Sequence, residues 1–451
     1  MPAFGKVLVA NRGAVAARIL RALGEMNIPS VAVYSDADAG APYLELASQT
    51  IRIGAAAARE SYLNQDALIA ALQETGADAV HPGYGFLSEN AAFANRVAAM
   101  GIAFIGPSPR WIADMGHKAR ARELAQHYVL PVGRGSGVLN NDPDATLQAA
   151  SAIGYPVLVK AAGGGGGIGM LPARSPDELL ATVARAADLC QRAFGTTDVY
   201  LEHLVERPRH IEFQILGDRH GNVAHLFERD CSVQRRYQKM IEEAPAPTVN
   251  RGHIQKTAAD LAQKLAAAGY DNIGTVEMLM DADGGLAFLE MNTRLQVEHG
   301  VTEEITGIDL VHAQIRSAAG ERLAEILPDT ISINGHAIEA RIYAEDPKRF
   351  FPSPGTLTTF RPPTDKSIRI ETGYCEGREI TPHYDPMIAK LIIHRPDREA
   401  ARRSLIDALQ NFKIEGVKSN IPALIAILNS DEFISGRPHT GLVGEVIARK
   451  A

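Results

Sequence analysis

The 451-residue sequence has little of several features that define whole classes of protein. It contains three cysteines and one tryptophan, shows no internal repeat or low-complexity tract, and begins with an apolar stretch too short for a signal peptide. Scattered cysteines in odd number fit neither a disulfide framework nor a paired-cysteine metal site, so we expect reduced thiols in a cytoplasmic protein. A net charge of −7 gives no global positive field for nucleic acid, and 46% hydrophobic residues is ordinary for a protein outside the membrane.

The chain is long enough for two or three domains. In the first hundred residues short apolar runs alternate with helix-like segments, which predicts a parallel sheet covered by helices. The expected strands are Val7–Ala10, Val31–Tyr34, Ala79–Val80 and Ala103–Ile105.

A helix is expected from Trp111 to Leu130, and the prolines and glycines that follow it predict a connector. Strands at Val157–Lys160 and Val199–Glu202 then frame a glycine run and an Ala-rich helix, as in a small α+β lid. The remaining strand-like runs are separated by turn residues and predict an antiparallel sheet. They are Ile211–Leu216, Val223–Glu228, Gly274–Met280 and Leu286–Asn292. The domain boundaries we predict are 1–115, a connector 116–133, a lid 134–204 and a C-terminal region 205–451.

Glycines 163 to 167, with Gly169, directly follow a strand that ends at Lys160. Glycine backbone can lie against phosphate oxygens, and the lysine can neutralise their charge. A flexible linker is the alternative, but the flanking strand favours a loop that covers phosphates. It is neither a P-loop nor a dinucleotide fingerprint, because no GK[ST] follows and no helix clearly begins there.

Glu277 and Glu290 lie on two strand-like segments joined by a turn. If Asp281 faces Leu286 across a four-residue loop, the register places Glu277 opposite Glu290, with Asn292 on the same face. Two carboxylates and an amide oxygen suit Mg²⁺ together with nucleotide phosphates. The alternative is a pair of solvated glutamates on an outer sheet face.

Arg294, Gln296 and Glu298 alternate within a few positions of these ligands. A cation, an amide and a carboxylate on one extended face can hold a small planar anion and supply a base. The cationic segment QRRYQK is, taken alone, more often a basic surface patch. It contains Gln234, Arg235, Arg236 and Lys239.

Together these motifs resemble the biotin carboxylases of the ATP-grasp superfamily, from end to end of the chain. The matching segments include HPGYGFLSEN, KAAGGGGGIGM, RPRHIEFQILGD, ERDCSVQRRYQK, EEAPAP, FLEMNTRLQVEH and EARIYAEDP. The resemblance implies an N-terminal parallel-sheet domain, an ATP-grasp lid and a C-terminal antiparallel-sheet domain, in an α/β and α+β protein of several domains.

The resemblance also implies roles for individual residues. Contacts to ATP are implied for Lys118, Lys160, Gly166, Gly167, Glu202, Leu204, His210, Gln234 and Tyr237. Ligands of Mg²⁺ or Mn²⁺ are implied for Glu277, Glu290 and Asn292. The bicarbonate site would consist of Lys239, Arg294, Gln296 and Val297, with Glu298 as the base that deprotonates bicarbonate and Arg341 as the residue that stabilises the biotin enolate.

The implied reaction makes carboxyphosphate from ATP and bicarbonate and then carboxylates biotin, as the first half-reaction of a biotin-dependent carboxylase of the acetyl-CoA or acyl-CoA type. We find no AMKM-type lysine that could accept biotin and expect no room for a carboxyltransferase domain. Biotin is therefore expected on a separate carrier protein, with separate carboxyltransferase subunits, and the family suggests a homodimer.

Three residues depart from the commonest family pattern, namely Ile168, Tyr237 and Gly300. Ile168 and Gly300 resemble the residues of urea carboxylases at these positions. A urea-type carboxylase is therefore one alternative. Others are an ATP-grasp ligase that joins a carboxylate to an amine, and a regulatory subunit that binds nucleotide without catalysis. A dinucleotide-dependent dehydrogenase is excluded, because no GxGxxG follows the first strand.

Overall fold

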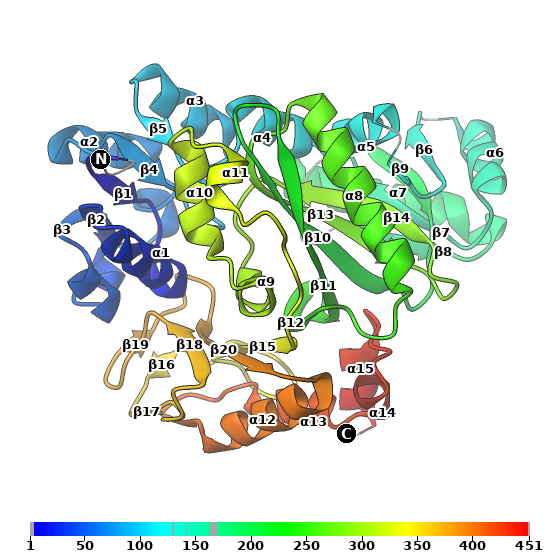
Figure 1. The fold of residues 1–451 in the computed structure, drawn as a ribbon. Coiled ribbons are helices and arrows are strands. Elements are labelled where there is room, and N and C mark those ends of the chain that lie inside the picture. The colour runs from blue at the N-terminus through cyan, green and yellow to red at the C-terminus, as the bar shows by residue number, and fades with distance from the viewer. Residues whose placement is uncertain (1–3, 129, 141, 163–168, 450–451) are drawn as a thin grey trace.

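The structure is a computed structural model that describes residues 4–128, 130–140, 142–162 and 169–449, without the side chains of Lys118 and Ala119. Figure 1 shows the first domain in blue, the lid in cyan beside α8, and the last helices in orange and red below the central sheet. The predicted fold class is confirmed, because a parallel sheet comes first and antiparallel sheets follow it.

The N-terminal sheet is parallel, with strand order β3-β2-β1-β4-β5. Its strands are β1 (Val7–Val9), β2 (Ser30–Ser35), β3 (Gln49–Gly54), β4 (Ala79–His81) and β5 (Ala103–Phe104). The helices around it are α1 (Gly13–Glu25), α2 (Gln65–Thr75), α3 (Ala91–Ala99) and α4 (Pro109–Met115), with 3-10 turns η1 (Asp36–Asp38), η2 (Pro42–Leu46) and η3 (Ala58–Glu60). Strand β3 was not predicted, because at the sheet edge only one of its residues, Ile53, is buried.

The single helix predicted from Trp111 to Leu130 is wrong, because α4 ends at Met115 and a second helix, α5 (Lys118–His127), begins three residues later. The side chain of His117 accepts a hydrogen bond from the backbone N–H of Arg120, 3.3 Å away, and so caps the second helix. Polar residues of this kind at a helix start compete with helix continuation.

The lid is a four-stranded sheet with order β6-β9-β7-β8 and two helices. Its elements are β6 (Gly135–Val138), α6 (Pro143–Ile153), β7 (Val157–Ala161), β8 (Leu171–Ala173), α7 (Pro176–Phe194) and β9 (Val199–His203). Buried Val157, Val159, Leu179 and Leu201 give the lid a core of its own. The glycines 163 to 167 and Ile168 lie outside the described residues.

The large sheet has eight strands, paired antiparallel in the order β14-β13-β10-β11-β12-β15-β20-β18. Its strands are β10 (Arg209–Gly217), β11 (Val223–Arg235), β12 (Gln238–Ala244), β13 (Asn272–Met280), β14 (Leu286–Asn292), β15 (His336–Tyr343), β18 (Ile368–Thr372) and β20 (Met387–Arg395). Two small ribbons pair β16 (Gly355–Thr356) with β19 (Glu379–Ile380) and β17 (Thr359–Arg361) with β21 (Lys413–Glu415). The helices of this region are α8 (Arg251–Ala268), α9 (His299–Thr306), α10 (Leu310–Ala318), α11 (Leu323–Ile326), α12 (Arg398–Asn411), α13 (Ile421–Leu428), α14 (Asp431–Ile434) and α15 (Leu442–Ala448).

The register between β13 and β14 decides where the carboxylates lie. Glu277 pairs with Glu290, as predicted, but the turn differs because Leu286 faces Met280 and not Asp281. A bulge next to Glu277 shifts the pairing by one residue and restores the predicted register. The carboxylates therefore share one face for a reason that the turn sequence does not reveal.

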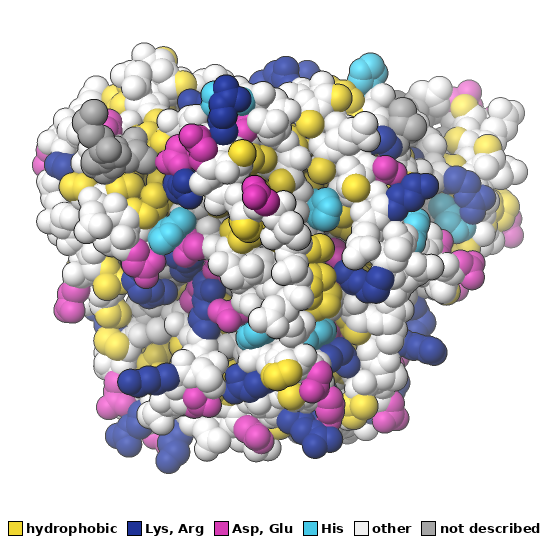
Figure 2. Space-filling view, viewed as in Figure 1, with side chains coloured by type: hydrophobic (Ala, Val, Ile, Leu, Met, Phe, Trp, Pro, Cys, Tyr) yellow, Lys and Arg dark blue, Asp and Glu magenta, His cyan; other side chains and the backbone are white. Residues whose placement is uncertain are grey.

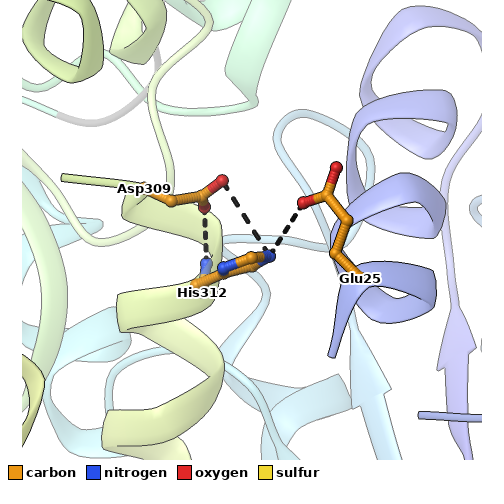
Figure 3. Close-up of side chains that lie close together, drawn as sticks. All are labelled: Glu25, Asp309 and His312. Atoms are coloured by element: carbon orange, nitrogen blue, oxygen red, sulfur yellow. Dashed lines mark hydrogen bonds and ion pairs between the residues drawn. The ribbon is translucent and has the colours of Figure 1, made fainter. Parts of the chain in front are cut away.

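The N-terminal domain packs closely on the central region. One hydrophobic core joins Val9 and Leu20 to Leu216 and Leu310. At the surface, His312 of α10 lies with its Nε2 3.2 Å from a carboxylate oxygen of Glu25 on α1 (Figure 3).

Charged side chains of both signs are intermingled on the face shown in Figure 2. Among the described residues, no helix is long and apolar enough to cross a membrane.

Candidate active site

A cavity of about 520 Å³ lies between the lid and the large sheet. The lid contributes Lys160 and Glu202, and the sheet contributes Lys239, Glu277 and Glu290. The loop after β14 and strand β15 complete the wall with Arg294, Gln296, Val297, Glu298 and Arg341. The structure thus brings together residues that are 181 positions apart in the sequence, from Lys160 to Arg341.

Lys239 is at the centre of the charged part of the cavity. Its Nζ lies 2.5 Å from Glu212, 2.9 Å from Glu277 and 2.7 Å from Glu298. Burial alone would lower the pKa of Lys239, but Glu212, Glu277 and Glu298 raise it well above its ordinary value. The lysine is therefore fully charged, and it belongs to the site and not to a basic surface patch.

Glu277 accepts hydrogen bonds from several donors at one oxygen. Besides Lys239, the amides of Asn292 and Gln296 donate to its Oε1 at 2.8 and 3.0 Å, while His210 Nε2 lies 3.1 Å from its Oε2. Burial would raise the pKa of Glu277, but Lys239 and His210 hold it well below its ordinary value. An ionised carboxylate that faces Glu290 across the strand pair, beside an amide oxygen, fits a divalent cation that prefers oxygen ligands.

The segment after Asn292 is not extended, as the predicted single face of Arg294, Gln296 and Glu298 would require. It forms a loop that leads into α9, and Leu295 turns into the hydrophobic core. The side chains of the alternate residues Asn292, Arg294 and Gln296 nevertheless lie together. Arg294 donates to Gln296 Oε1 at 2.9 Å and to Asn292 Oδ1 at 2.8 Å. Arg294 Nε also donates to Glu89 of the N-terminal domain at 2.8 Å, a partner that the sequence did not reveal.

Glu298 is fully buried between two cations. Lys239 donates to its Oε1 at 2.7 Å, and Arg341 Nη2 donates to its Oε2 at 2.8 Å. Burial would raise the pKa of Glu298, but Lys239, Arg341 and Arg229 lower it well below its ordinary value. The carboxylate is therefore ionised, with one cation bound at each oxygen.

Lys160 and Glu202 meet at the lid end of the cavity. Lys160 Nζ donates to Glu202 Oε2 at 2.6 Å, and Arg122 Nη1 donates to the other oxygen at 2.7 Å. Leu204 lines the same part of the cavity, and its N–H donates to the carbonyl of Pro156. A fully buried ammonium beside a cavity is suited to the phosphate tail of a nucleotide.

Most of the other predicted residues also line this cavity. His210, Gln234 and Val297 are in its wall, and Val297 accepts a hydrogen bond from Lys390 through its carbonyl. Tyr237 is 56% exposed and has a positive φ in the two-residue turn between β11 and β12. Lys118 begins α5, but its side chain, like Gly166 and Gly167, lies outside the described part of the chain.

Sequence reasoning missed two buried residues that support Lys239. Glu212 accepts hydrogen bonds from both Lys239 and Arg229, and the distance from Arg229 Nε to Glu212 Oε1 is 2.5 Å. Arg229 is entirely buried and also donates to Gln214 and Thr302. Strand periodicity could have suggested Glu212, which is two residues from His210 on β10, but nothing local marks Arg229 as its partner.

Glu277 belongs to a group of three side chains that could hold a metal ion. The possible ligand atoms of His210, Glu212 and Glu277 lie within 4.8 Å of one another. The cluster of Glu25, Asp309 and His312 (Figure 3) lies between α1 and α10, and none of its residues lines the cavity.

Comparison with known proteins agrees with this arrangement. Models of the biotin carboxylase N-terminal and C-terminal domains match residues 3–112 and 339–445, and the carbamoyl-phosphate synthase L chain ATP binding domain matches residues 117–326. Biotin carboxylase 2 of Bacillus subtilis is 48% identical, over 96% of this chain and 97% of that protein. The chain belongs to the biotin carboxylase family.

Solved biotin carboxylases have the same fold. A Campylobacter jejuni biotin carboxylase in complex with β,γ-ATP has a TM-score of 0.94 and 41% identity, over 98% of this chain and 99% of that one. The biotin carboxylase domain dimer of Hydrogenobacter thermophilus 2-oxoglutarate carboxylase, with MgADP, ADP and bicarbonate, has a TM-score of 0.93 and 43% identity, over 98% of both chains. The matches on both sides of the ATP-binding region distinguish this biotin carboxylase from other ligases that share that region.

Proposed function

We propose that the chain uses ATP and bicarbonate to carboxylate biotin held on a carrier protein, through carboxyphosphate, as the first half-reaction of a biotin-dependent carboxylase. The observation that supports this most directly is the row of alternating charges Lys239, Glu298 and Arg341 in one cavity. It combines a cation for an anionic substrate, a base and a second cation for the anion formed from biotin.

The nucleotide would lie between the lid and the large sheet. Its phosphates would bind Lys160, with Lys118, Gly166 and Gly167, and its adenosine would bind near Glu202, Leu204, His210, Gln234 and Tyr237. Glu277, Glu290 and Asn292 would hold Mg²⁺ or Mn²⁺, which supplies positive charge for the phosphates.

Bicarbonate would bind Lys239 and Arg294, with the Gln296 amide and the Val297 backbone. Phosphoryl transfer to a bicarbonate oxygen then forms carboxyphosphate and ADP, and the bicarbonate proton passes to Glu298. Glu298 is a weak base while both cations touch it. An anion that draws Lys239 toward itself would raise the pKa of Glu298 and make the transfer easier.

Biotin would occupy the cavity of about 490 Å³ next to the first. Arg294, Val297 and Arg341 line both cavities, so that one wall would serve both steps. Carboxyphosphate splits into CO₂ and phosphate, and the phosphate takes the ureido proton of biotin. Arg341 then stabilises the enolate until its nitrogen attacks CO₂.

The partners we propose are a biotin carboxyl carrier protein and carboxyltransferase subunits. The name of one relative supports this role within a larger carboxylase, since the propionyl-CoA carboxylase alpha chain of Ruegeria pomeroyi is 42% identical over 98% of this chain and 68% of that protein. A homodimer is also proposed, as in the solved domain dimer. Cytoplasmic location fits the free thiols of Cys190 and Cys231.

The test is ATP hydrolysis with and without bicarbonate and free biotin. We expect hydrolysis to require bicarbonate and to be stimulated by biotin. Glu298→Gln should lower the bicarbonate-dependent rate by about 10²–10⁴-fold, the usual contribution of a general base. Glu303→Gln, which changes a buried glutamate of α9 outside the cavity, is the control. A wild-type rate that is indifferent to both substrates would refute the proposal.

A further inference from the structure

Two glutamates that no proposed step uses lie behind Arg341. Glu242 of β12 and Glu339 of β15 face each other as register partners, and both are 0% exposed. Within the described part of the chain, neither oxygen of Glu242 and only one of Glu339 has a hydrogen-bond partner. Buried carboxylates without such partners are costly, and they are retained where they serve a neighbouring charge.

The two glutamates lie at different distances from their nearest cations. Glu242 Oε1 lies 2.6 Å from Arg341 Nε, while Arg341 Nη2 donates to Glu298. Glu339 Oε2 lies 3.4 Å from Lys390 Nζ, but Lys390 has a closer partner, Glu371, at 2.8 Å. The guanidinium therefore lies between two carboxylates, with an ion pair to Glu242 at Nε and a hydrogen bond to Glu298 at Nη2.

The charges around the pair do not balance if both glutamates are ionised. The cations that face it are Arg341 and Lys390, with Lys239 further along, and the anions are Glu298 and Glu371. The buried tyrosines near it are Tyr84, beside Glu339, and Tyr343, beside Glu242. Burial raises the pKa of Glu242 to about 8 and that of Glu339 to about 7. Although the higher of the two pKa values is that of Glu242, its oxygen lies 2.6 Å from Arg341 Nε, whereas the oxygen of Glu339 lies 3.4 Å from Lys390 Nζ. The closer ion pair favours a charged Glu242, so we assign the proton that the pair retains mainly to Glu339.

We propose that Glu242 and Glu339 are positioning residues for the biotin step. Glu242 fixes the Arg341 guanidinium from its Nε, and Glu339 keeps one proton, so that the pair carries a single negative charge. A second charge would bind Arg341 more tightly and compete with the enolate for it. This inference depends on the proposed function, because it assigns a supporting role to residues behind the biotin site.

Three variants test the inference in the full chain. Glu242→Gln removes the carboxylate from Arg341 Nε, and Glu339→Gln imitates a permanently protonated Glu339. Glu243→Gln is the matched control, because Glu243 is the next residue of β12 but pairs with His336 and Arg398, which do not line the cavity. The readouts are kcat and KM for free biotin, KM for ATP, and ATP hydrolysis without biotin.

We expect Glu242→Gln to lower kcat/KM for biotin at least tenfold, with KM for ATP and biotin-independent hydrolysis within threefold of wild type. At pH 7 all four of these readouts should stay within threefold of wild type in Glu339→Gln. As the pH rises through about 7 to 8, wild-type kcat/KM for biotin should fall while the pair loses its proton. Glu339→Gln should not show this fall, a difference that a purely structural role would not produce.

The possible failures are distinguishable. If biotin does not stimulate the wild type, the proposed function is wrong and the inference falls with it. If wild type responds but Glu242→Gln behaves like Glu243→Gln, or Glu339→Gln retains the alkaline fall, the inference alone is refuted. Circular dichroism checks the folding of each variant, and if Glu242→Gln does not fold, the pH profile of Glu339→Gln decides.

Discussion

Replacing Lys239 with methionine should remove the cation on which the charged half of the site depends. The ammonium faces Glu212, Glu277 and Glu298 at 2.5 to 2.9 Å. Methionine has a similar length and no charge, so the variant removes the ion pairs while filling most of the space. The carboxylates would then repel one another in a buried region.

The structure bounds the size of the effect. At an effective dielectric constant of about 20, each pair attracts by roughly 6 kcal/mol, most of which offsets desolvation. Removing one partner of a buried pair costs about 3–5 kcal/mol. Here each carboxylate keeps another neighbour, since Arg229 faces Glu212, His210 faces Glu277 and Arg341 faces Glu298. We therefore expect a loss of stability near the lower limit, about 3 kcal/mol.

Activity should fall further than stability suggests. Loss of one charged donor to a reacting anion typically costs about 10²–10³-fold, and we expect this loss in kcat/KM for bicarbonate. The assay is ADP release as a function of bicarbonate concentration, with ATP and biotin saturating. Lys239→Arg keeps the charge but not the compact geometry and should lose about tenfold. A Lys239→Met enzyme within threefold of wild type would refute this role of the lysine.

Two further predictions concern stability, measured by urea unfolding. The depressed pKa values of Glu277 and Glu298 stabilise the fold above their ordinary pKa of about 4.3, and this stability is lost as the pH falls below it. The advantage of wild type over Lys239→Met should therefore shrink between pH 7 and pH 3, and a constant difference would contradict it. Gly300→Ala places a Cβ 2.5 Å from Ile392 Cδ1 and should cost about 1–3 kcal/mol; adding Ile392→Val, which removes that atom, should restore most of the loss.

Much of the site could be predicted from sequence because its residues are dense in short segments. Glu277 and Glu290 lie on strands joined by one short turn, so that the period of a strand and an assumed turn were enough to predict their pairing. The wrong turn did no harm only because the bulge beside Glu277 compensated for it. Bulges have no reliable sequence signal, and the agreement in register was thus partly fortunate.

What could not be predicted depends on contacts between distant segments. Glu89 meets Arg294 across 205 positions, and Glu242 meets Arg341 only because β12 and β15 are neighbours in the sheet. A single sequence contains no signal for such pairs. Strand β3 was missed for a local reason, because an exposed edge strand shows little hydrophobic pattern.

The charged groups of the site explain why substrate binding and catalysis would be linked. Lys239 and Arg341 are paired with carboxylates of the protein. An anionic substrate must compete with those carboxylates, and a released carboxylate is then free to bind a divalent cation or a proton. Glu277 would take the first and Glu298 the second. The contacts that hold the cations in place would therefore make the binding of one ligand favour the binding of the next.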